Sequence, residues 1–237
     1  MASTPAVRLA ANVWRIPTAP AALVNSYAFV EDDGSVTLVD TGVKKAPPRI
    51  VAGLAAMGKH PHDVTRIVLT HAHPDHAGGV AELARRTGAP VQLHDAEHPW
   101  AEAGEVLAKP KETTLLGRLL MRVSKPTFEP FSPGPALADG EVLPVAGGLR
   151  VVHTPGHSPG HVSLLHEPSG VLVTGDAIFN VRSVRLSPKS LCADFQLTRQ
   201  TAHRLGELDY DVAAFTHGPE IRDNARERVR GFLRDLA

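Results

Sequence analysis

Five short apolar segments in this chain each run directly into a histidine or an aspartate. The five pairs are VTLV with Asp40, RIVLT with His71, LRVVHTPG with His157, VLVTG with Asp176 and VAAFT with His217. Apolar runs of this length, bounded by Gly, Pro or Asp, are typical of β-strands. Because ligands in open α/β sheets bind beyond the carboxyl ends of the strands, we expect these five side chains to gather around one crevice.

Strand-like and helix-like segments alternate along the chain. Strands are predicted at 25–30, 36–39, 66–69, 91–93, 149–152, 162–166, 171–174 and 212–215. The helical spacing of apolar residues predicts helices within 44–58, 77–88, 197–208 and 221–236. The alternation predicts an α/β fold, and the lack of a Pro/Gly-rich linker favours one domain over residues 1–237.

Charge balance and cysteine count limit the classes of partner and compartment. Lysine plus arginine equals aspartate plus glutamate at 25 each, so the chain offers no basic field for nucleic acid. The first residues lack a basic region followed by an apolar run, and no apolar stretch is long enough to span a bilayer. Cys192 is the only cysteine, which excludes a disulfide within the chain. We therefore expect a cytoplasmic, soluble protein that acts on a small molecule.

The densest cluster of metal-binding side chains is the stretch HAHPDH. His71 and His73 alternate with an alanine, so an extended backbone would project both imidazoles to one side. Pro74 keeps His73 away from helical geometry, and Asp75 and His76 then begin the turn into the next helix. One short loop is therefore able to supply two adjacent ions. Imidazole and carboxylate ligands suit Zn²⁺, and also iron or manganese.

Motifs spread over most of the chain resemble those of one known family. HAHPDH matches the HxHxDH signature of the metallo-β-lactamase superfamily, and LVDTG, HTPGHSPGH, TGD and FTHGPE match elements around it. The resemblance implies an αβ/βα four-layer sandwich, in which two mixed sheets lie face to face with helices outside and metals at one edge.

The resemblance also implies a role for each residue at a matching position. Two metal ions would share seven ligands: His71, His73 and His157 on the first ion, Asp75, His76 and His217 on the second, and Asp176 as the bridge. Asp40 would orient a ligand, and His161 would support its loop through a hydrogen bond. The sequence departs from many relatives at His217, where it has THG in place of GHG.

Such a site implies hydrolysis without a serine or cysteine nucleophile, and the chain has no G-x-S-x-G element. Two cations that share a carboxylate also share a water and lower its pKa until hydroxide forms near neutral pH. They polarise a carbonyl and stabilise its oxyanion, and Asp75 would take up the proton. We therefore expect a dinuclear zinc hydrolase of an ester, a thioester or a lactone that acts through a metal-bridging hydroxide.

Three other functions remain open. A persulfide dioxygenase has this fold and much of the signature, but uses one iron held by two histidines and a carboxylate. A β-lactamase fits less well because its ligand near Asp176 differs, and a non-catalytic scaffold does not need a complete ligand set. Among hydrolases, only 20 residues follow His217, too few for the glutathione-binding extension of glyoxalase II, and Phe179 replaces a tyrosine usual in lactonases.

Residues 105–133 lie outside the matching motifs. The stretch TTLLGRLLMRV in this segment places Leu116 and Leu120 on one face of a predicted helix. That face would either pack on the core or a homodimer partner, or form a lid that lines the substrate pocket. Phe179 and Arg182 are further candidate substrate contacts, because both follow Asp176 closely.

Overall fold

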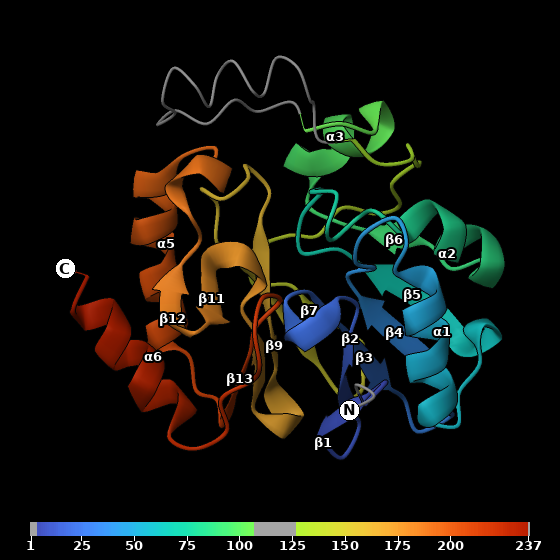
Figure 1. The fold of residues 1–237 in the computed structure, drawn as a ribbon, viewed down its shortest axis with the longest axis horizontal. Helices are drawn as coiled ribbons and strands as arrows, with labels where there is room; N and C mark the ends of the chain where they lie inside the picture. Colours follow the sequence, from blue (N-terminus) through green and yellow to red (C-terminus); the bar gives the residue numbers. More distant parts are fainter. Residues whose placement is uncertain (1–3, 107–126, 237) are drawn as a thin grey trace.

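Two β-sheets lie face to face at the centre of the molecule, and helices cover the outer face of each (Figure 1). The computed structural model describes residues 4–106 and 127–236. The helices on the first sheet are α1 (Pro47–Ala56) and α2 (Val80–Thr87), at the right of Figure 1, and those on the second are α5 (Phe195–Glu207) and α6 (Ala225–Arg234), at the left. The αβ/βα four-layer arrangement implied by the sequence is confirmed.

The first sheet has six strands in chain order. They are β1 (Val7–Ala10), β2 (Val13–Pro17), β3 (Asn25–Val30), β4 (Val36–Val39), β5 (Val64–Val68) and β6 (Val91–Gln92). Strands β1 to β4 are antiparallel neighbours, whereas β4, β5 and β6 are parallel. Parallel neighbours need a long crossover connection, which α1 and α2 supply on the outer face.

The second sheet has five strands in the order β13-β10-β9-β8-β7. In chain order they are β7 (Val142–Leu143), β8 (Leu149–His153), β9 (Val162–His166), β10 (Val171–Val173) and β13 (Val212–Ala214). Strand β13 joins β10 in parallel after the crossover through α5. A separate hairpin of β11 (Ile178–Val181) and β12 (Ser183–Leu186) lies between β10 and α5, and α3 (His98–Ala103) follows β6.

The alternation of side chains along the strands fills separate apolar layers. Tyr27 and Phe29 of β3 are buried between the sheets, whereas Ala28 packs on the side of α1 and α2. On β8, Val151 lies between the sheets and Val152 packs on the side of α5 and α6. Because successive side chains point to opposite faces, each central strand contributes to two layers and is buried on both.

Strand direction brings the five candidate segments to one edge of this sandwich. In the first sheet, β4 and β5 are parallel. In the second, β8 and β10 are both antiparallel to β9, and β13 is parallel to β10, so all three run the same way. The N–H of Val162 donates to the carbonyl of Thr70 at 2.9 Å and joins the two sheets at this edge. The residues after these strands therefore meet in space, as the sequence predicts.

The structure adds strands β1, β2, β7, β11 and β12 and helix α3 to the elements predicted from the sequence. The β11–β12 hairpin turns at Arg182, whose φ is 67°, whereas Gly, Asn or Asp usually occupies such a position. The last helix begins at Ala225 rather than at residue 221, because Ile221 exchanges two backbone hydrogen bonds with Ala213 of β13. Pairing of β11 with β12 therefore decided the hairpin, and pairing of Ile221 with β13 decided where the last helix begins.

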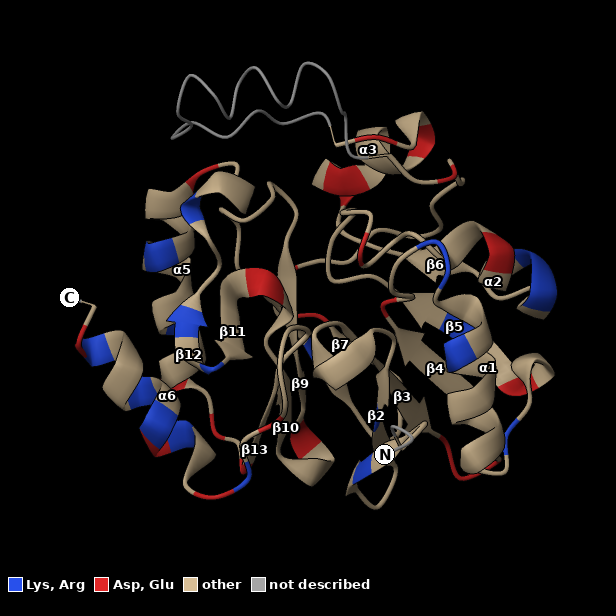
Figure 2. Cartoon of the chain, in the orientation of Figure 1, with Lys and Arg blue, Asp and Glu red and all other residues tan. Residues whose placement is uncertain are grey.

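Helix α6 is basic on its outer side, as its sequence predicts, and its arginines are blue in Figure 2. Val229 and Leu233 are buried, whereas Arg228 and Arg230 are exposed. In the described ranges, 4–106 and 127–236, none of the helices combines the length and the apolar character needed to cross a bilayer.

Leu164→Ala should lower the free energy of unfolding by about 2–5 kcal/mol, because it opens a cavity between the sheets, where Leu164 is fully buried. Val142→Ala is the control, since Val142 is 49% exposed, and it should change that free energy by less than about 0.5 kcal/mol. Urea unfolding followed by circular dichroism measures both. Similar values for the two variants would contradict a core between the sheets.

Candidate metal centre

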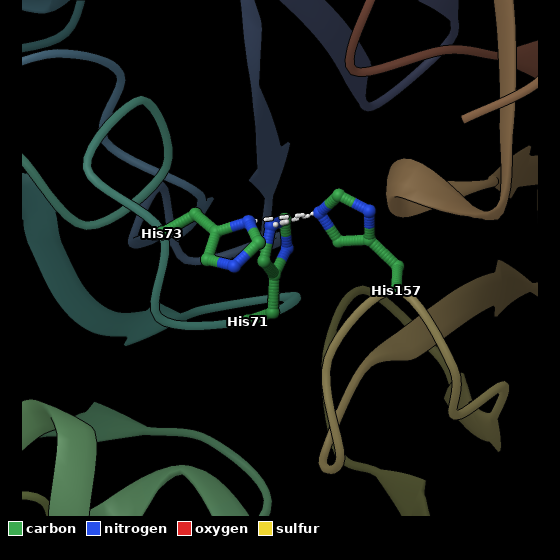
Figure 3. Close-up of side chains that lie close together, drawn as sticks. All are labelled: His71, His73 and His157. Carbon is green, nitrogen blue, oxygen red and sulfur yellow. Dashed lines mark hydrogen bonds between the residues drawn. The ribbon is translucent and has the colours of Figure 1, made fainter. Parts of the chain in front are cut away.

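Three imidazoles from two loops converge at the shared edge of the sheets (Figure 3). His71 and His73 follow β5, and His157 follows β8. The Nε2 atom of His157 lies 3.1 Å from Nε2 of His71 and 2.8 Å from Nδ1 of His73. Ligand atoms around a tetrahedral zinc ion lie about 3.3 Å apart, given Zn–N bonds of about 2.0–2.1 Å. The spacing and direction of these nitrogens therefore fit one metal ion.

A second group of ligand atoms lies next to the first. It consists of Asp75 and His76, at the start of the turn after His73, and His217, which follows β13. The Nε2 atoms of His76 and His217 are 3.3 Å apart, and Oδ2 of Asp75 lies 3.7 Å and 3.4 Å from them, respectively. These three donors also fit a single metal ion.

Asp176 lies between the two groups. Its Oδ1 atom is 3.2 Å from Nε2 of His76 and 3.3 Å from Nε2 of His217. Its Oδ2 atom is 3.3 Å from Nε2 of His157 and 4.0 Å from Nε2 of His71. One carboxylate therefore presents a different oxygen to each group, which is the arrangement that a bridging ligand requires.

The protonation of the first group suits metal binding. Burial lowers the pKa of His73 to about 4 and lowers the pKa of His71 and His157 well below the ordinary value. These imidazoles are therefore neutral at physiological pH. A neutral imidazole has the free lone pair that a metal ligand needs.

The second group attracts positive charge. Burial disfavours the charged form of His217, but Asp176 and Asp75 outweigh it and raise the pKa of His217 to about 10. Burial acts to raise the pKa of Asp176. The imidazoles of His217 and His76 lower it more strongly, so the pKa of Asp176 lies well below the ordinary value. The carboxylates are therefore charged and pair with cationic partners. Divalent cations would satisfy the same carboxylates.

Asp40, which the resemblance implies as a ligand-orienting carboxylate, contacts one imidazole and the loop that precedes it. The residue is fully buried at the end of β4 and has a φ of 59°. Its carboxylate accepts the N–H of Thr70 at 2.8 Å and the Thr70 hydroxyl at 2.9 Å. Its Oδ2 atom also lies 2.8 Å from Nδ1 of His76. This contact leaves Nε2 of His76 to face Asp176 and His217.

Other candidate ligands are fixed through their second nitrogen by groups that the sequence does not reveal. Nδ1 of His157 lies 2.9 Å from the hydroxyl of Ser187, and Nδ1 of His217 donates to the carbonyl of Leu23 at 2.6 Å. Contacts of this kind set the tautomer and the ring orientation of a metal-binding histidine. No sequence signal marks them, because a backbone carbonyl belongs to every residue and serine is common.

His161 supports Asp176 instead of joining the ligand cluster. Its Nδ1 donates to the carbonyl of Thr154 at 3.0 Å, and its Nε2 accepts the backbone N–H of Asp176 at 2.7 Å. Gly175 makes this approach possible, because a Cβ atom there would lie 2.4 Å from Nε2 of His161. His161 therefore holds the backbone of Asp176 through a hydrogen bond.

The predicted substrate contacts are distributed unevenly. The ring of Phe179 packs on that of His217, with 4.3 Å between centroids. Arg182 is exposed in the turn of the β11–β12 hairpin. Leu116 and Leu120, and with them most of the segment 105–133, lie outside the described residues.

Comparison with known sequences identifies relatives. The profile of the Metallo-beta-lactamase superfamily matches residues 20–217. The probable metallo-hydrolase YflN of Bacillus subtilis (strain 168) is 28% identical over 172 residues, which cover 71% of this chain and 63% of that protein. An N-acyl homoserine lactonase of Bacillus cereus is 32% identical over 163 residues, covering 68% and 57%, respectively. The chain therefore spans less than two thirds of the length of these two proteins.

Solved structures share the whole fold. A metallo-beta-lactamase family protein from Thermus thermophilus superimposes with a TM-score of 0.72 and 31% identity, covering 96% of this chain and 80% of that chain. A B3 metallo-beta-lactamase with an active-site glutamic acid gives a TM-score of 0.76 at 22% identity, covering 99% and 88%. The second likeness concerns the fold alone.

Asp176→Asn should lower the amount of divalent metal that the chain retains, because the amide removes the charge that both groups of ligand atoms share. Asp139→Asn is the control, since Asp139 is a carboxylate bonded to Arg204 and the N–H of His153. Elemental analysis after exhaustive dialysis measures the metal content. Equal metal content in the two variants would contradict the position assigned to Asp176.

Proposed function

The chain belongs to the metallo-beta-lactamase superfamily, and from this premise we propose that it is a dinuclear, zinc-dependent hydrolase of an ester, a thioester or a lactone. The observation that carries the proposal is the position of Asp176, whose two oxygens face two separate groups of ligand atoms. Nitrogen and oxygen donors without a thiolate suit zinc, and they also suit iron or manganese. The hydrolase and lactonase names of the relatives agree with this reaction class.

Two divalent cations in these groups would lower the pKa of a water between them and polarise a substrate carbonyl. The protein residues would then have distinct tasks. Asp75 is 37% exposed, whereas the side chains of His71, His76 and Asp176 are nearly inaccessible. Asp75 is therefore the carboxylate nearest to solvent, where it would accept the proton that the attacking water releases.

Three of the exposed apolar residues lie next to the loops that carry the candidate ligands. In the described part of the chain, the large apolar side chains that are exposed are Leu23, Val43, Leu191 and Val142. The Leu23 carbonyl accepts from His217. The backbone of Val43 would lie 2.7 Å from a Cβ atom on Gly78. In sequence, Leu191 lies between Ser187 and Ala193, which both contact His157. Exposed apolar groups that gather at a site favour an apolar ligand. We therefore propose that the substrate has an apolar group beside the scissile bond.

Asp75→Ala and His217→Ala should each lower kcat/KM for ester, thioester or lactone hydrolysis by at least about a hundredfold, which is typical of losing a metal or an oriented proton acceptor. The measurement compares a p-nitrophenyl ester, a thioester and an acyl lactone, together with the metal content. Asp209→Ala is the control, because Asp209 pairs with Arg226 at the surface. Normal turnover in both variants, or oxygen uptake with a persulfide that persists in them, would favour the one-iron dioxygenase.

Leu23→Ser and Leu191→Ser should raise KM for octanoyl esters by about three- to tenfold and leave acetyl esters unchanged, because each loses roughly 1 kcal/mol of apolar contact. Val142→Ser is the matched control, since Val142 is equally exposed but pairs with Arg150 at the amino end of β8. Steady-state kinetics over an ester series measures the effect. A wild-type enzyme with no preference for long chains would contradict the apolar contact.

A further inference from the structure

We propose that Glu97 is a positioning residue that fastens the loop of His71 and His73 to the loop of His157, and so assembles the first metal group. The proposal rests on the dinuclear centre proposed above. Glu97 ends a short 3-10 turn, Asp95–Glu97, directly before α3. It lies outside the motifs of the sequence, and its side chain reaches two of them.

The contacts of Glu97 join loops from different sheets. Its Oε2 atom accepts the N–H of Ala72 at 3.0 Å, and its Oε1 atom accepts the N–H of Gly160 at 2.8 Å. Ala72 separates His71 from His73, and Gly160 lies three residues after His157. Each carboxylate oxygen therefore fixes one of the two loops. Nδ1 of His73 and Nε2 of His157, which these loops carry, lie 2.8 Å apart although the two residues are 84 positions apart in sequence.

Only a carboxylate satisfies both N–H groups at this position. Glu97 is fully buried, so its two oxygens are shielded from solvent. An isosteric glutamine would turn an NH₂ group toward one of the two N–H donors, leaving that donor unsatisfied. Residue 160 must also be small, because a Cβ atom there would lie 2.7 Å from Cγ of Glu97. The glycine and the carboxylate therefore form one fitted contact.

The same segment supports His73 from a second direction. Trp100 of α3 stacks on His73 with 5.8 Å between ring centroids and an angle of 16° between the planes. The indole is 4% exposed, so it limits the rotation of the imidazole. Glu97 thus fixes the backbone beside His73, and Trp100 fixes its ring.

This support is specific to the first metal group. In the second group, His76 is oriented by Asp40, and His217 by the carbonyl of Leu23. The backbone bonds of Glu97 are to Ala72 and Gly160, which flank ligands of the first group. Loss of Glu97 should therefore weaken the first site and spare the second, a selectivity that a general loss of stability would not produce.

The test is zinc titration of metal-free Glu97→Gln protein in a Trp14→Phe background. The chain has two tryptophans, so the emission of Trp100 then reports on the ring stacked against it, His73. We expect the affinity of the site seen by Trp100 to fall at least about tenfold, as for other groups that orient metal ligands. Elemental analysis after dialysis should show that the ion of the second group is retained as in the wild type.

The matched control is Glu31→Gln in the same background. The carboxylate of Glu31 accepts the N–H of Ala146 at 2.7 Å. Glu31 follows β3, and the end of β3 lies beside the start of β4, at the edge of the sheet away from the metal site. This variant should keep both zinc affinities. Should Glu97→Gln fail to fold, Gly160→Ala displaces the same carboxylate and should produce the same selective loss.

Two results would overturn the inference. Unchanged zinc affinity at the site seen by Trp100 would show that the contacts of Glu97 with Ala72 and Gly160 do not position His73 and His157. Equal weakening of both sites, with a lower melting temperature, would show that Glu97 only stabilises the fold. In either case wild-type protein that binds two zinc ions leaves the proposed function intact, whereas wild-type protein that binds none would overturn both proposals.

Discussion

Buried carboxylates at the edge shared by the two sheets are the constraint on which the rest of the site depends. Asp40 and Glu97 are fully buried, and Asp176 is 2% exposed. A buried charge is costly unless hydrogen bonds or opposite charges compensate it. Each carboxylate is therefore surrounded by donors. Glu97 accepts from two backbone N–H groups, and Asp40 contacts Thr70 and His76. Asp176 contacts imidazoles and the hydroxyl of Thr216. Meeting this requirement positions the histidines.

Those donors come from both sheets, so the charges also hold the sandwich together at its open edge. The hydroxyl of Tyr27 on β3 donates to the carbonyl of Phe215 after β13 at 2.6 Å. The amide of Asn25 donates to the carbonyls of Phe215 and Gly218, and Arg15 pairs with Glu220 at 2.8 Å. This network fixes the segment that carries His217. The metal edge is therefore rigid because polar contacts there replace the apolar packing found between the sheets.

The two ligand groups differ because of their surroundings. The first is made of imidazoles whose burial keeps them neutral, and the second has a carboxylate of its own in addition to Asp176. In the proposed dinuclear centre, a neutral group and an anionic group that share Asp176 would provide different environments for two cations. That difference is a physical basis for unequal metal affinity and for distinct tasks in a reaction.

The sequence by itself determined the α/β class, the strands that end in ligand residues and the spacing of HAHPDH, because these depend on neighbouring residues along the chain. The positions of His71, His157 and Asp176 follow from such local patterns. The family resemblance implied that Asp176 faces both groups, but only the tertiary structure decided that Glu97 joins two loops and that Ser187 contacts His157. Serine and glutamate are common residues with no signature, and their partners lie tens of residues away. Their roles exist only once the two sheets have packed.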